Sequence, residues 1–330
     1  MIKLSSYKKG IFLYAKALLV YQGLKRYLKK DFLKDLQFPK ELQKDYFYQS
    51  TYYNRTKQYM HANHFFGELL CLIRGEKMNQ VERMRFANLS SCAPIFDDFF
   101  EEGADLEHIQ YLLAHPDLKN THSEQEKLAV HFLNNLLVSL KEPKDFLKAA
   151  DHLFVAQKLS KQQKSRRLTS EYLLRISEQK GGFSGLMYTY LLEGKKAPKF
   201  IELGYSLGSF GQIMDDIYDL YDDAKEGIHT FANQSKKVGD LRFIVEEQEQ
   251  NLRLLAEEVA LNQKTYQSFQ DVLKIFISII DLALEQFEKI ESDWQIPPHR
   301  CLEMERHYWI IDMEKTSNIS KLFFKSLRKF

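Results

Sequence analysis

The sequence predicts an all-α protein, a single domain built as one large helical bundle. Only 14 glycines and 7 prolines occur in 330 residues, and most fall between apolar-periodic runs, where they indicate helix ends. The runs repeat at helical spacing, and no convincing strand pattern is found. About ten to twelve helices account for the chain without a repeat or a linker, so we expect residues 1–330 to form one α-domain.

The bulk composition predicts a large buried core. Hydrophobic residues make up 44% of the chain, and 24 Phe, 18 Tyr and 2 Trp give an unusually aromatic protein. So many rings predict a core, or a cavity with aromatic walls, and they exclude a disordered chain.

The N-terminal segment 1–30 is expected to be a basic amphipathic helix within this domain. Its apolar stretch, residues 11–21, is interrupted by Lys16 and is shorter than the roughly 20 residues of a membrane span. No small-residue cleavage site follows. The basic side chains, which lie either on a membrane surface or on a solvated helix face, are Lys8, Lys9, Lys16, Lys25, Arg26, Lys29 and Lys30. The expected location is cytoplasmic, with a peripheral membrane contact left open.

Helix ends in the middle of the chain can be placed from capping residues. Pro116 ends a helix over residues 106–115, because proline cannot continue one. Ser123 and Glu126 have capping-box spacing ahead of the apolar run 128–140.

Later helix ends follow the same logic. Pro143 belongs to the first turn of one helix, and Pro198 opens a long helix that Gly227 closes. The polar stretch 232–240 is expected to be a loop.

Charge and motif content exclude several function classes. Lys and Arg total 47 against 45 Asp and Glu, and a net charge of +2 predicts no nucleic-acid partner. Cys71, Cys92 and Cys301 are odd in number and widely spaced, which predicts buried core thiols in a reducing compartment. The chain has no phosphate-binding glycine loop, no H-E-x-x-H pattern and no paired E-x-x-H spacing, so a zinc hydrolase and a ferritin-like di-iron site are disfavoured.

A first acidic cluster lies at the end of an apolar helix, in residues 93–103. Asp97 and Glu101 are one helical turn apart, as are Asp98 and Glu102, so each pair shares a face and repels. Burying these carboxylates among phenylalanines is costly unless a cation balances them. The cluster therefore predicts a cation.

A second acidic cluster, residues 211–223, lies well inside the helix that begins at Pro198. The carboxylates that fall on or beside one stripe of this helix, at about 100° per residue, are Asp215, Asp216, Asp219, Asp222 and Asp223.

Three glycines, Gly204, Gly208 and Gly211, extend the same stripe toward the start of the helix. Each costs about 1 kcal/mol relative to alanine in a helix interior. We therefore expect something bulky to lie against that face.

Together the two clusters predict a pocket with an apolar body and Mg²⁺ at its mouth. Mg²⁺ takes one or two carboxylates per ion, with waters and phosphate oxygens completing its shell. The alternative is that each cluster is an ordinary solvated acidic helix face.

The two clusters resemble the motifs of the class I isoprenoid synthases, which include terpene synthases and trans-prenyltransferases. Asp97-Asp-Phe-Phe-Glu101 is similar to the first Asp-rich motif, and Gln212-Ile-Met-Asp-Asp-Ile-Tyr-Asp219 is similar to the second. Residues 178–187 resemble the Lys-Gly-Gly-x-Ser stretch of bacterial large terpene synthases. In the family this stretch is a helix break near the diphosphate, and an ordinary turn between helices is the alternative.

The resemblance implies a helical bundle around a central cavity and a Mg²⁺-dependent terpene synthase. Two or three Mg²⁺ ions would help to ionise a prenyl diphosphate, from farnesyl to geranylfarnesyl diphosphate or longer, and a carbocation would then react. Family members are often homodimers, so a homodimer is left open.

Departures from the family pattern leave two alternatives. The basic segment that binds a second diphosphate in chain-elongating enzymes is reduced to Arg74-Gly-Glu-Lys77, which disfavours elongation. Asp215, Asp219 and Asp223 stand at the spacing of the Asn, Ser and Glu triad of typical cyclases, and Arg306-His-Tyr308 approximates their Arg-Tyr pair. A chain-elongating prenyltransferase and a catalytically inactive partner subunit stay open.

The expected site residues fall into four groups. Those expected to act in catalysis are Asp97, Asp98, Asp215 and Asp219. Those expected to bind Mg²⁺ are Asp97, Asp98, Glu101, Asp215, Asp216, Asp219, Asp222 and Asp223. Those expected to bind the diphosphate are Lys180, Lys225, Arg74 and Lys77. Those expected to line the pocket are Phe96, Phe100, Phe183, Gly204, Gly208, Gly211 and Gln212.

Overall fold

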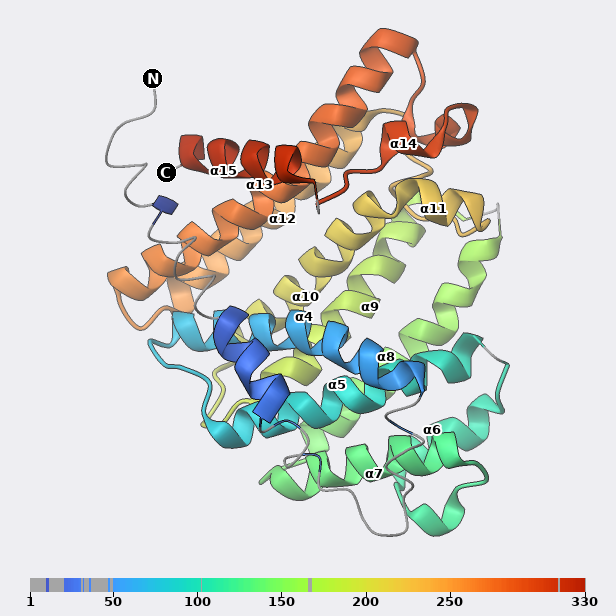
Figure 1. Cartoon of the computed structure of the whole chain (residues 1–330), viewed down its shortest axis with the longest axis vertical. Coiled ribbons are helices and arrows are strands. Elements are labelled where there is room, and N and C mark those ends of the chain that lie inside the picture. Colours follow the sequence, from blue (N-terminus) through green and yellow to red (C-terminus); the bar gives the residue numbers. More distant parts are fainter. Residues whose placement is uncertain are drawn as a thin grey trace. The chain divides into compact units, whose positions relative to one another are not determined.

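A computed structural model describes most of the chain (Figure 1). The residues described are 10–11, 21–30, 32, 36, 47, 50–101, 103–165, 168–313 and 315–329, without the side chain of Glu101. Residues 10–11 and 21–30 are helical. The α-helices after them are α4 (Thr51–Ile73), α5 (Gln80–Glu101), α6 (Leu106–Ala114), α7 (Glu124–Ser139), α8 (Lys144–Ser160), α9 (Ser170–Leu191), α10 (Pro198–Tyr218), α11 (Leu220–Lys225), α12 (Val238–Val259), α13 (Gln263–Trp294), α14 (Arg306–Trp309) and α15 (Thr316–Lys329). Three short 3₁₀ helices are η1 (Leu118–Asn120), η2 (Lys161–Lys164) and η3 (Pro298–Glu303). No strand occurs in these ranges, so the all-α prediction is confirmed for them.

The chain forms two compact units. The N-terminal unit comprises Ala17–Gln157 and Leu186–Lys196, and the C-terminal unit comprises Met1–Lys16, Lys158–Gly185 and Ala197–Phe330. Helix α9 contributes its first part to the C-terminal unit and its last part to the N-terminal unit. The expectation of one α-domain stays a prediction. Of the expected N-terminal basic helix, residues 10–11 and 21–30 are described and helical, and within 21–30 Lys25, Arg26, Lys29 and Lys30 are exposed.

Helices α4, α5 and α7 form the core of the N-terminal unit, with α5 packed against both others. Met60 on α4, Phe86 on α5 and Phe132 on α7 are fully buried. Helix α7 begins where the sequence predicts, because the Ser123 hydroxyl accepts a hydrogen bond from the backbone N–H of Glu126 at 3.1 Å.

The three cysteines are buried and free. Burial raises the pKa of Cys71 to about 12, of Cys92 to about 12 and of Cys301 to about 11. The thiols therefore stay protonated at neutral pH and act as small apolar core groups, as the sequence predicts.

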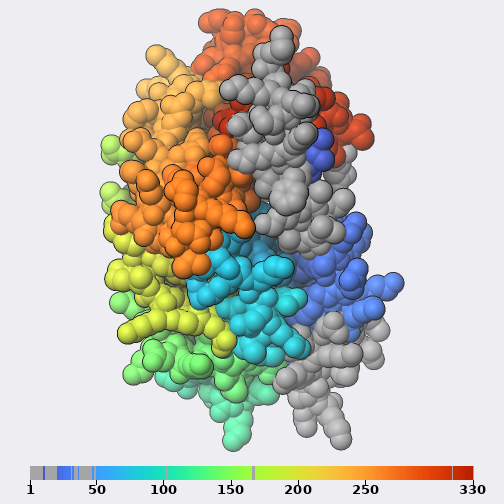
Figure 2. All heavy atoms as spheres, turned by 90° about the vertical axis from the view of Figure 1, so that its left-hand side faces the viewer, coloured from blue at the N-terminus to red at the C-terminus, as the bar shows by residue number. Residues whose placement is uncertain are grey.

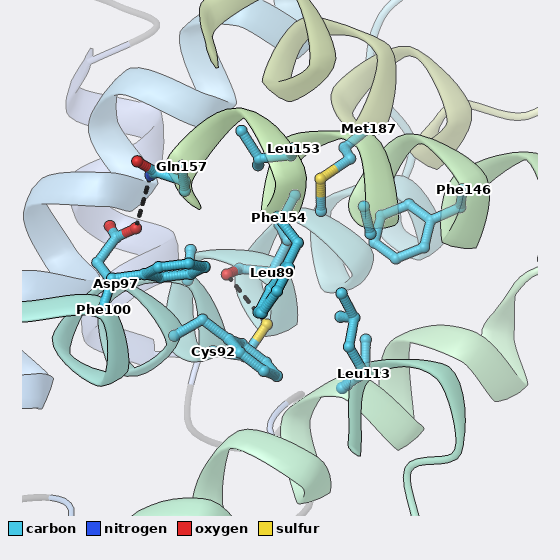
Figure 3. A pocket seen from close by; sticks show the side chains of 14 residues that line it. Leu89, Cys92, Asp97, Phe100, Leu113, Phe146, Leu153, Phe154, Gln157 and Met187 are labelled. Atoms are coloured by element: carbon cyan, nitrogen blue, oxygen red, sulfur yellow. Dashed lines mark hydrogen bonds between the residues drawn. The ribbon is translucent and has the colours of Figure 1, made fainter. Parts of the chain in front are cut away.

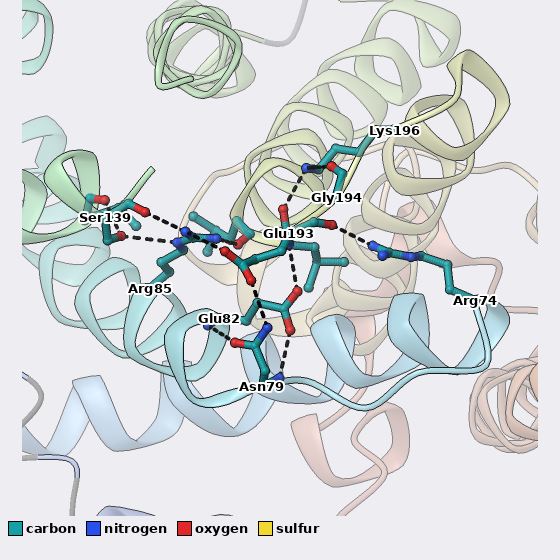
Figure 4. A network of polar contacts seen from close by, with 11 residues as sticks. Arg74, Asn79, Glu82, Arg85, Ser139, Glu193, Gly194 and Lys196 are labelled. Atoms are coloured by element: carbon teal, nitrogen blue, oxygen red, sulfur yellow. Dashed lines mark hydrogen bonds and ion pairs between the residues drawn. The ribbon is translucent and has the colours of Figure 1, made fainter. Parts of the chain in front are cut away.

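A polar network ties the end of α9 to the start of α5 (Figure 4). The buried Arg85 guanidinium donates to the carbonyl of Leu191 at 2.9 Å and to the Ser139 hydroxyl at 3.2 Å. Glu82 accepts from the backbone N–H of Glu193 at 2.7 Å. These bonds satisfy backbone groups that the end of α9 leaves unpaired, and they hold residues 186–196 in the N-terminal unit.

Helices α10, α12, α13 and α15 pack in succession in the C-terminal unit. The atoms of α12 and α13 form a continuous orange surface in Figure 2. Within the described residues, no helix is both long enough and apolar enough to span a membrane. Helix α12 starts at Val238, so the loop expected over 232–240 ends earlier than predicted.

The long helix expected between Pro198 and Gly227 is interrupted. Pro198 does open α10 and Gly227, with φ of 72°, does end α11, but Asp219 between them has φ −91° and ψ 8°. The backbone N–H of Asp219 still bonds to Asp215 O, and that of Asp223 bonds to Asp219 O, each at 2.8 Å. The four-residue spacing of the second acidic cluster therefore continues across the break.

Helices α9 and α10 meet backbone to backbone through glycines. A Cβ added at Gly208 would lie 2.1 Å from the carbonyl oxygen of Gly181 and 2.8 Å from Cα of Gly185, and one at Gly185 would lie 2.2 Å from the oxygen of Gly204. The expectation that a ligand lies against Gly204 and Gly208 is wrong, because α9 occupies that face.

The same contact explains residues 178–187. Helix α9 is continuous through them, so neither the expected helix break nor a turn between helices occurs there. Glycine is needed at Gly181 and Gly185 of α9, because a Cβ at either position would collide with the backbone of α10. Gly211 differs, because a Cβ there would meet no atom within 4 Å.

We predict opposite stability effects for two Gly→Ala changes on α10. Gly208→Ala should lower the free energy of unfolding by about 1–3 kcal/mol, because the methyl group must push α9 away. Gly211→Ala, the matched control, should raise it by about 1 kcal/mol through helix propensity. Urea denaturation of both variants tests this, and a stabilised Gly208→Ala protein would contradict the packing described.

Candidate functional site

The first acidic cluster belongs to the C-terminal end of α5. Asp97 is half-buried and accepts a hydrogen bond from the Tyr59 hydroxyl at 2.5 Å and another from the Gln157 amide at 3.3 Å. Burial of the phenol, with the Asp97 charge beside it, raises the pKa of Tyr59 well above its usual range. Tyr59 therefore stays protonated and remains a donor to Asp97.

Asp98 forms an ion pair with Arg55 of α4. The side chain of Asp98 keeps 12% of its surface exposed and that of Arg55 keeps 28%. The cation that the sequence requires beside this buried carboxylate is therefore supplied by the protein itself. The side chain of Glu101, the third expected ligand of this cluster, lies outside the described residues.

An apolar cavity of about 80 Å³ adjoins Asp97 within the N-terminal unit (Figure 3). Phe96, Phe100, Phe146 and Phe154 supply rings to its wall. Figure 3 shows Asp97 and Gln157 joined on one side, with Phe154, Met187, Phe146 and Leu113 beyond them. An apolar cavity of about 150 Å³ holds one benzene ring, so this cavity accepts a small apolar group or the end of a chain.

The second acidic cluster is built around α10 and α11 in the C-terminal unit. The Gln212 amide donates to Asp215 at 3.0 Å and to Asp216 at 2.9 Å. The hydroxyl of Ser177, on α9, also donates to the buried Asp216. These donors orient two neighbouring carboxylates without neutralising them.

Burial and mutual repulsion raise three pKa values in this cluster. The pKa of Asp223 rises to about 8 through burial and the charges of Asp216, Asp219 and Asp215. Burial is also the main cause for Asp216 and for the partly buried Asp219, whose pKa values rise to about 6. Lys180 lowers the pKa of Asp216 and of Asp223, which places its positive charge beside them.

Asp222 faces a different partner. Its two oxygens accept from Arg306 Nε at 2.7 Å and Nη2 at 2.6 Å, and this contact lowers the pKa of Asp222, with a further contribution from Lys225. Both side chains are well exposed, so the pair adds at most about 1 kcal/mol of stability. Asp222 is held by an arginine here, and it does not share the raised pKa of its neighbours.

Two expected diphosphate-binding residues lie far from the first cluster. Arg74 and Lys77 precede α5, whereas Asp97 lies near its other end, and a helix rises about 1.5 Å per residue, so roughly 25 Å separates them. Arg74 instead donates to the carbonyl of Glu193 at 3.0 Å and pairs with Glu76 at 2.7 Å. The expectation that these two cations share a diphosphate with Asp97 is wrong.

The remaining expected pocket residues do not line the cavity of Figure 3. Phe183 packs edge-on against Tyr205, with ring centroids 5.5 Å apart. Gly204 and Gly208 contact α9, Gly211 is exposed, and Gln212 binds the carboxylates. Of the expected pocket residues, Phe96 and Phe100 line the cavity.

The structure adds residues that the sequence did not indicate. Arg55, Tyr59 and Gln157 contact the first cluster, and Ser177 contacts the second. Arg55 and Tyr59 are one turn apart on α4, but nothing in that spacing points to residues about 40 positions later. Such partners are visible only once the helices are packed.

Comparison with known proteins does not assign a family. No protein-family model matches the chain, and a search of curated proteins finds no matching relative. The likeness of residues 97–101 and 212–219 to isoprenoid synthase motifs therefore rests on short segments, and what it implies about activity is a proposal.

We predict that the contribution of Asp216, Asp219 and Asp223 to the stability of the metal-free protein falls as the pH rises from about 4 to 8. The folded pKa values of Asp216, Asp219 and Asp223 exceed the unfolded value of 3.8, so the folded state binds more protons in this window. Asp223→Asn should raise Tm at pH 8 and flatten this fall. Thermal denaturation in a chelator from pH 5 to 8 measures both effects.

Asp240→Asn is the matched control, because Asp240 is exposed on α12. It should keep the wild-type pH profile. If the profile of Asp223→Asn superimposes on that of wild type, ionisation of Asp223 does not destabilise the folded protein.

A double-mutant cycle tests the Arg55–Asp98 pair. Arg55→Met should cost about 2 kcal/mol, because it leaves a buried carboxylate unpaired. Asp98→Asn in the same background should recover part of that loss, since no charge is then stranded. Additive effects of the two changes in urea denaturation would contradict the ion pair.

Proposed function

We propose that this protein is a Mg²⁺-dependent class I isoprenoid synthase, and specifically a terpene synthase that ionises a prenyl diphosphate and releases diphosphate. One observation carries the proposal. Asp215, Asp219 and Asp223 follow one another at four-residue spacing across the α10–α11 junction, with Lys180 and Arg306 beside the cluster.

The donor set of this cluster fits Mg²⁺. Mg²⁺ uses few carboxylates per ion and keeps waters and phosphate oxygens. Among the described residues, no three of these carboxylates lie close enough together to bind one ion. They therefore suit ions that are also coordinated by a ligand better than an ion bound by protein groups alone. Asp215, Asp219 and Asp223 would hold the ions, which when bound stabilise negative charge on departing diphosphate.

Electrostatics supports the same assignment. Carboxylates that repel one another inside a folded protein destabilise it, and a divalent cation relieves that repulsion. The cluster has Lys180 as a neighbour but no arginine paired with Asp216 or Asp223 among the described residues. This supports a site at which a bound cation would balance the carboxylate charge.

Two basic side chains are placed to bind phosphate oxygens. Arg306 presents Nε and Nη2 together to Asp222, the geometry in which arginine also grips phosphate. The positive charge of Lys180 lowers the pKa of both Asp216 and Asp223. We assign diphosphate binding to these two residues, and Lys225 lies near Asp222 as a third cation.

The first cluster supports the proposal independently. Asp97 lines an apolar cavity with Phe96 and Phe100, and ring faces stabilise a desolvated cation by about 2 kcal/mol. For Asp97 to bind Mg²⁺, it would exchange the donors Tyr59 and Gln157 for the ion. Tyr59 would then lose Asp97 as its hydrogen-bond acceptor.

The state of Arg74 favours a terpene synthase over a chain-elongating enzyme. Elongation needs a second diphosphate site, which requires concentrated positive charge. Arg74 donates to the backbone carbonyl of Glu193 and forms an ion pair with Glu76. Lys77 is the other cation of that segment. This supports a reaction of one diphosphate.

An assay with three substrates tests the proposal. Farnesyl, geranylgeranyl and geranylfarnesyl diphosphates are incubated with the protein, with and without Mg²⁺, and diphosphate release and extracted products are measured. We expect Mg²⁺-dependent hydrocarbon or alcohol products from at least one substrate. Asp215→Asn should lower kcat by at least about 100-fold, whereas the control Asp240→Asn should not.

Other outcomes have distinct meanings. No diphosphate release from any of the three substrates would overturn the terpene synthase assignment. Longer diphosphates formed only when isopentenyl diphosphate is added would identify an elongating prenyltransferase. Mg²⁺-dependent binding of a non-hydrolysable diphosphate analogue without turnover would identify an inactive partner subunit.

A further inference from the structure

A second group of potential metal ligands lies in the N-terminal unit, on α6 and at the start of α7. His108, His122 and Glu126 each offer one ligand atom, and these three atoms lie within 4.8 Å of one another. Among the described residues, this is the one group of three or more His, Cys, Asp or Glu side chains that approach so closely. Neither acidic cluster contributes to it.

Glu126 is held in place by the cap of α7. Its backbone N–H donates to Ser123 Oγ, and its Oε2 accepts from the backbone N–H of His122 at 2.6 Å. The side chain keeps 12% of its surface exposed. The carboxylate is therefore oriented by backbone hydrogen bonds, as a ligand of a preformed site must be.

His108 brings α6 to the same point. Its Nε2 lies 3.2 Å from Glu126 Oε2, and its ring stacks on the ring of His122 with centroids 4.2 Å apart and planes 4° apart. Stacking is one of the arrangements that aromatic rings favour, and here it holds the exposed His122 ring beside His108. The rings are gathered around the carboxylate.

We propose that His108, His122 and Glu126 bind Zn²⁺ or a similar first-row transition metal ion, with water in a fourth position. Two imidazole nitrogens and one carboxylate are a donor set of zinc and its neighbours, whereas Mg²⁺ and Ca²⁺ prefer oxygen alone. Bonds of about 2.1 Å in tetrahedral geometry put ligand atoms about 3.4 Å apart. The exposed His122 side chain can close that gap by rotating.

The ion would have a structural effect on the cavity of Figure 3. Helices α6 and α7, which carry His108 and Glu126, also supply Leu113 and Leu133 to the cavity wall. One ion bound to both helices would fasten the connecting segment 115–123 and fix these two walls. This inference goes beyond the proposed activity and does not depend on it.

Zinc binding by the full-length, tag-free protein tests the site. The chelator-stripped protein is titrated with Zn²⁺ by calorimetry and with Co²⁺ by visible absorption, which reports tetrahedral nitrogen and oxygen coordination. We expect one equivalent of ion at micromolar concentration or tighter, and a higher Tm with Zn²⁺. His122→Ala should weaken binding by at least about tenfold and abolish the Tm shift.

Three further variants make the outcome specific. His115→Ala, a matched control at the other end of α6 and outside the cluster, should bind like wild type. Glu126→Gln keeps an oxygen that can accept from the backbone N–H of His122, but it loses the negative charge. This variant should therefore fold and bind Zn²⁺ weakly. Asp215→Asn should bind Zn²⁺ normally, which separates this site from the carboxylates of α10. Absence of Zn²⁺ binding to wild type, or equal binding by His122→Ala and Glu126→Gln, would overturn the proposal.

Discussion

The close approach of α9 and α10 is the constraint on which the candidate site of the C-terminal unit depends. Glycines allow the two backbones to touch, because any Cβ at Gly208 would collide with the carbonyl of Gly181. That contact brings Ser177 and Lys180 of α9 to the carboxylate of Asp216 on α10. A wider helix pair would leave the carboxylate without the hydroxyl and the positive charge that its burial requires.

The two acidic clusters manage buried charge in different ways. In the N-terminal unit, Asp98 is neutralised by Arg55, whereas Asp97 accepts hydrogen bonds from the neutral donors Tyr59 and Gln157. In the C-terminal unit, burial and repulsion raise the pKa of Asp223 to about 8, and Lys180 compensates only in part. Carboxylates that repel one another in a buried cluster are typical of functional sites. The metal proposal therefore rests on the carboxylates of α10 and α11.

Sequence reasoning succeeded where local chemistry decides the structure and failed where a neighbouring element does. Ser123 starts α7 because a hydroxyl satisfies a free backbone N–H within the same segment. The glycine stripe was misinterpreted, because the cost of Gly208 in a helix shows that something lies close but not whether it is a ligand or another helix. The interruption at Asp219 was missed, since no glycine or proline marks it and the four-residue bonds from Asp219 to Asp215 and from Asp223 to Asp219 continue across it.

By itself, the sequence determined the all-α class, the bounds of α6, the starts of α7, α8 and α10, the end of α11, the burial of the cysteines and the placement of carboxylates one turn apart. These follow from propensity, capping and periodicity, which act over a few residues. Only the tertiary structure decided which groups meet those carboxylates. Arg55 lies 43 positions from Asp98 and Ser177 lies 39 from Asp216, so their pairing depends on how whole helices pack. A spacing pattern contains no information about a partner on another helix.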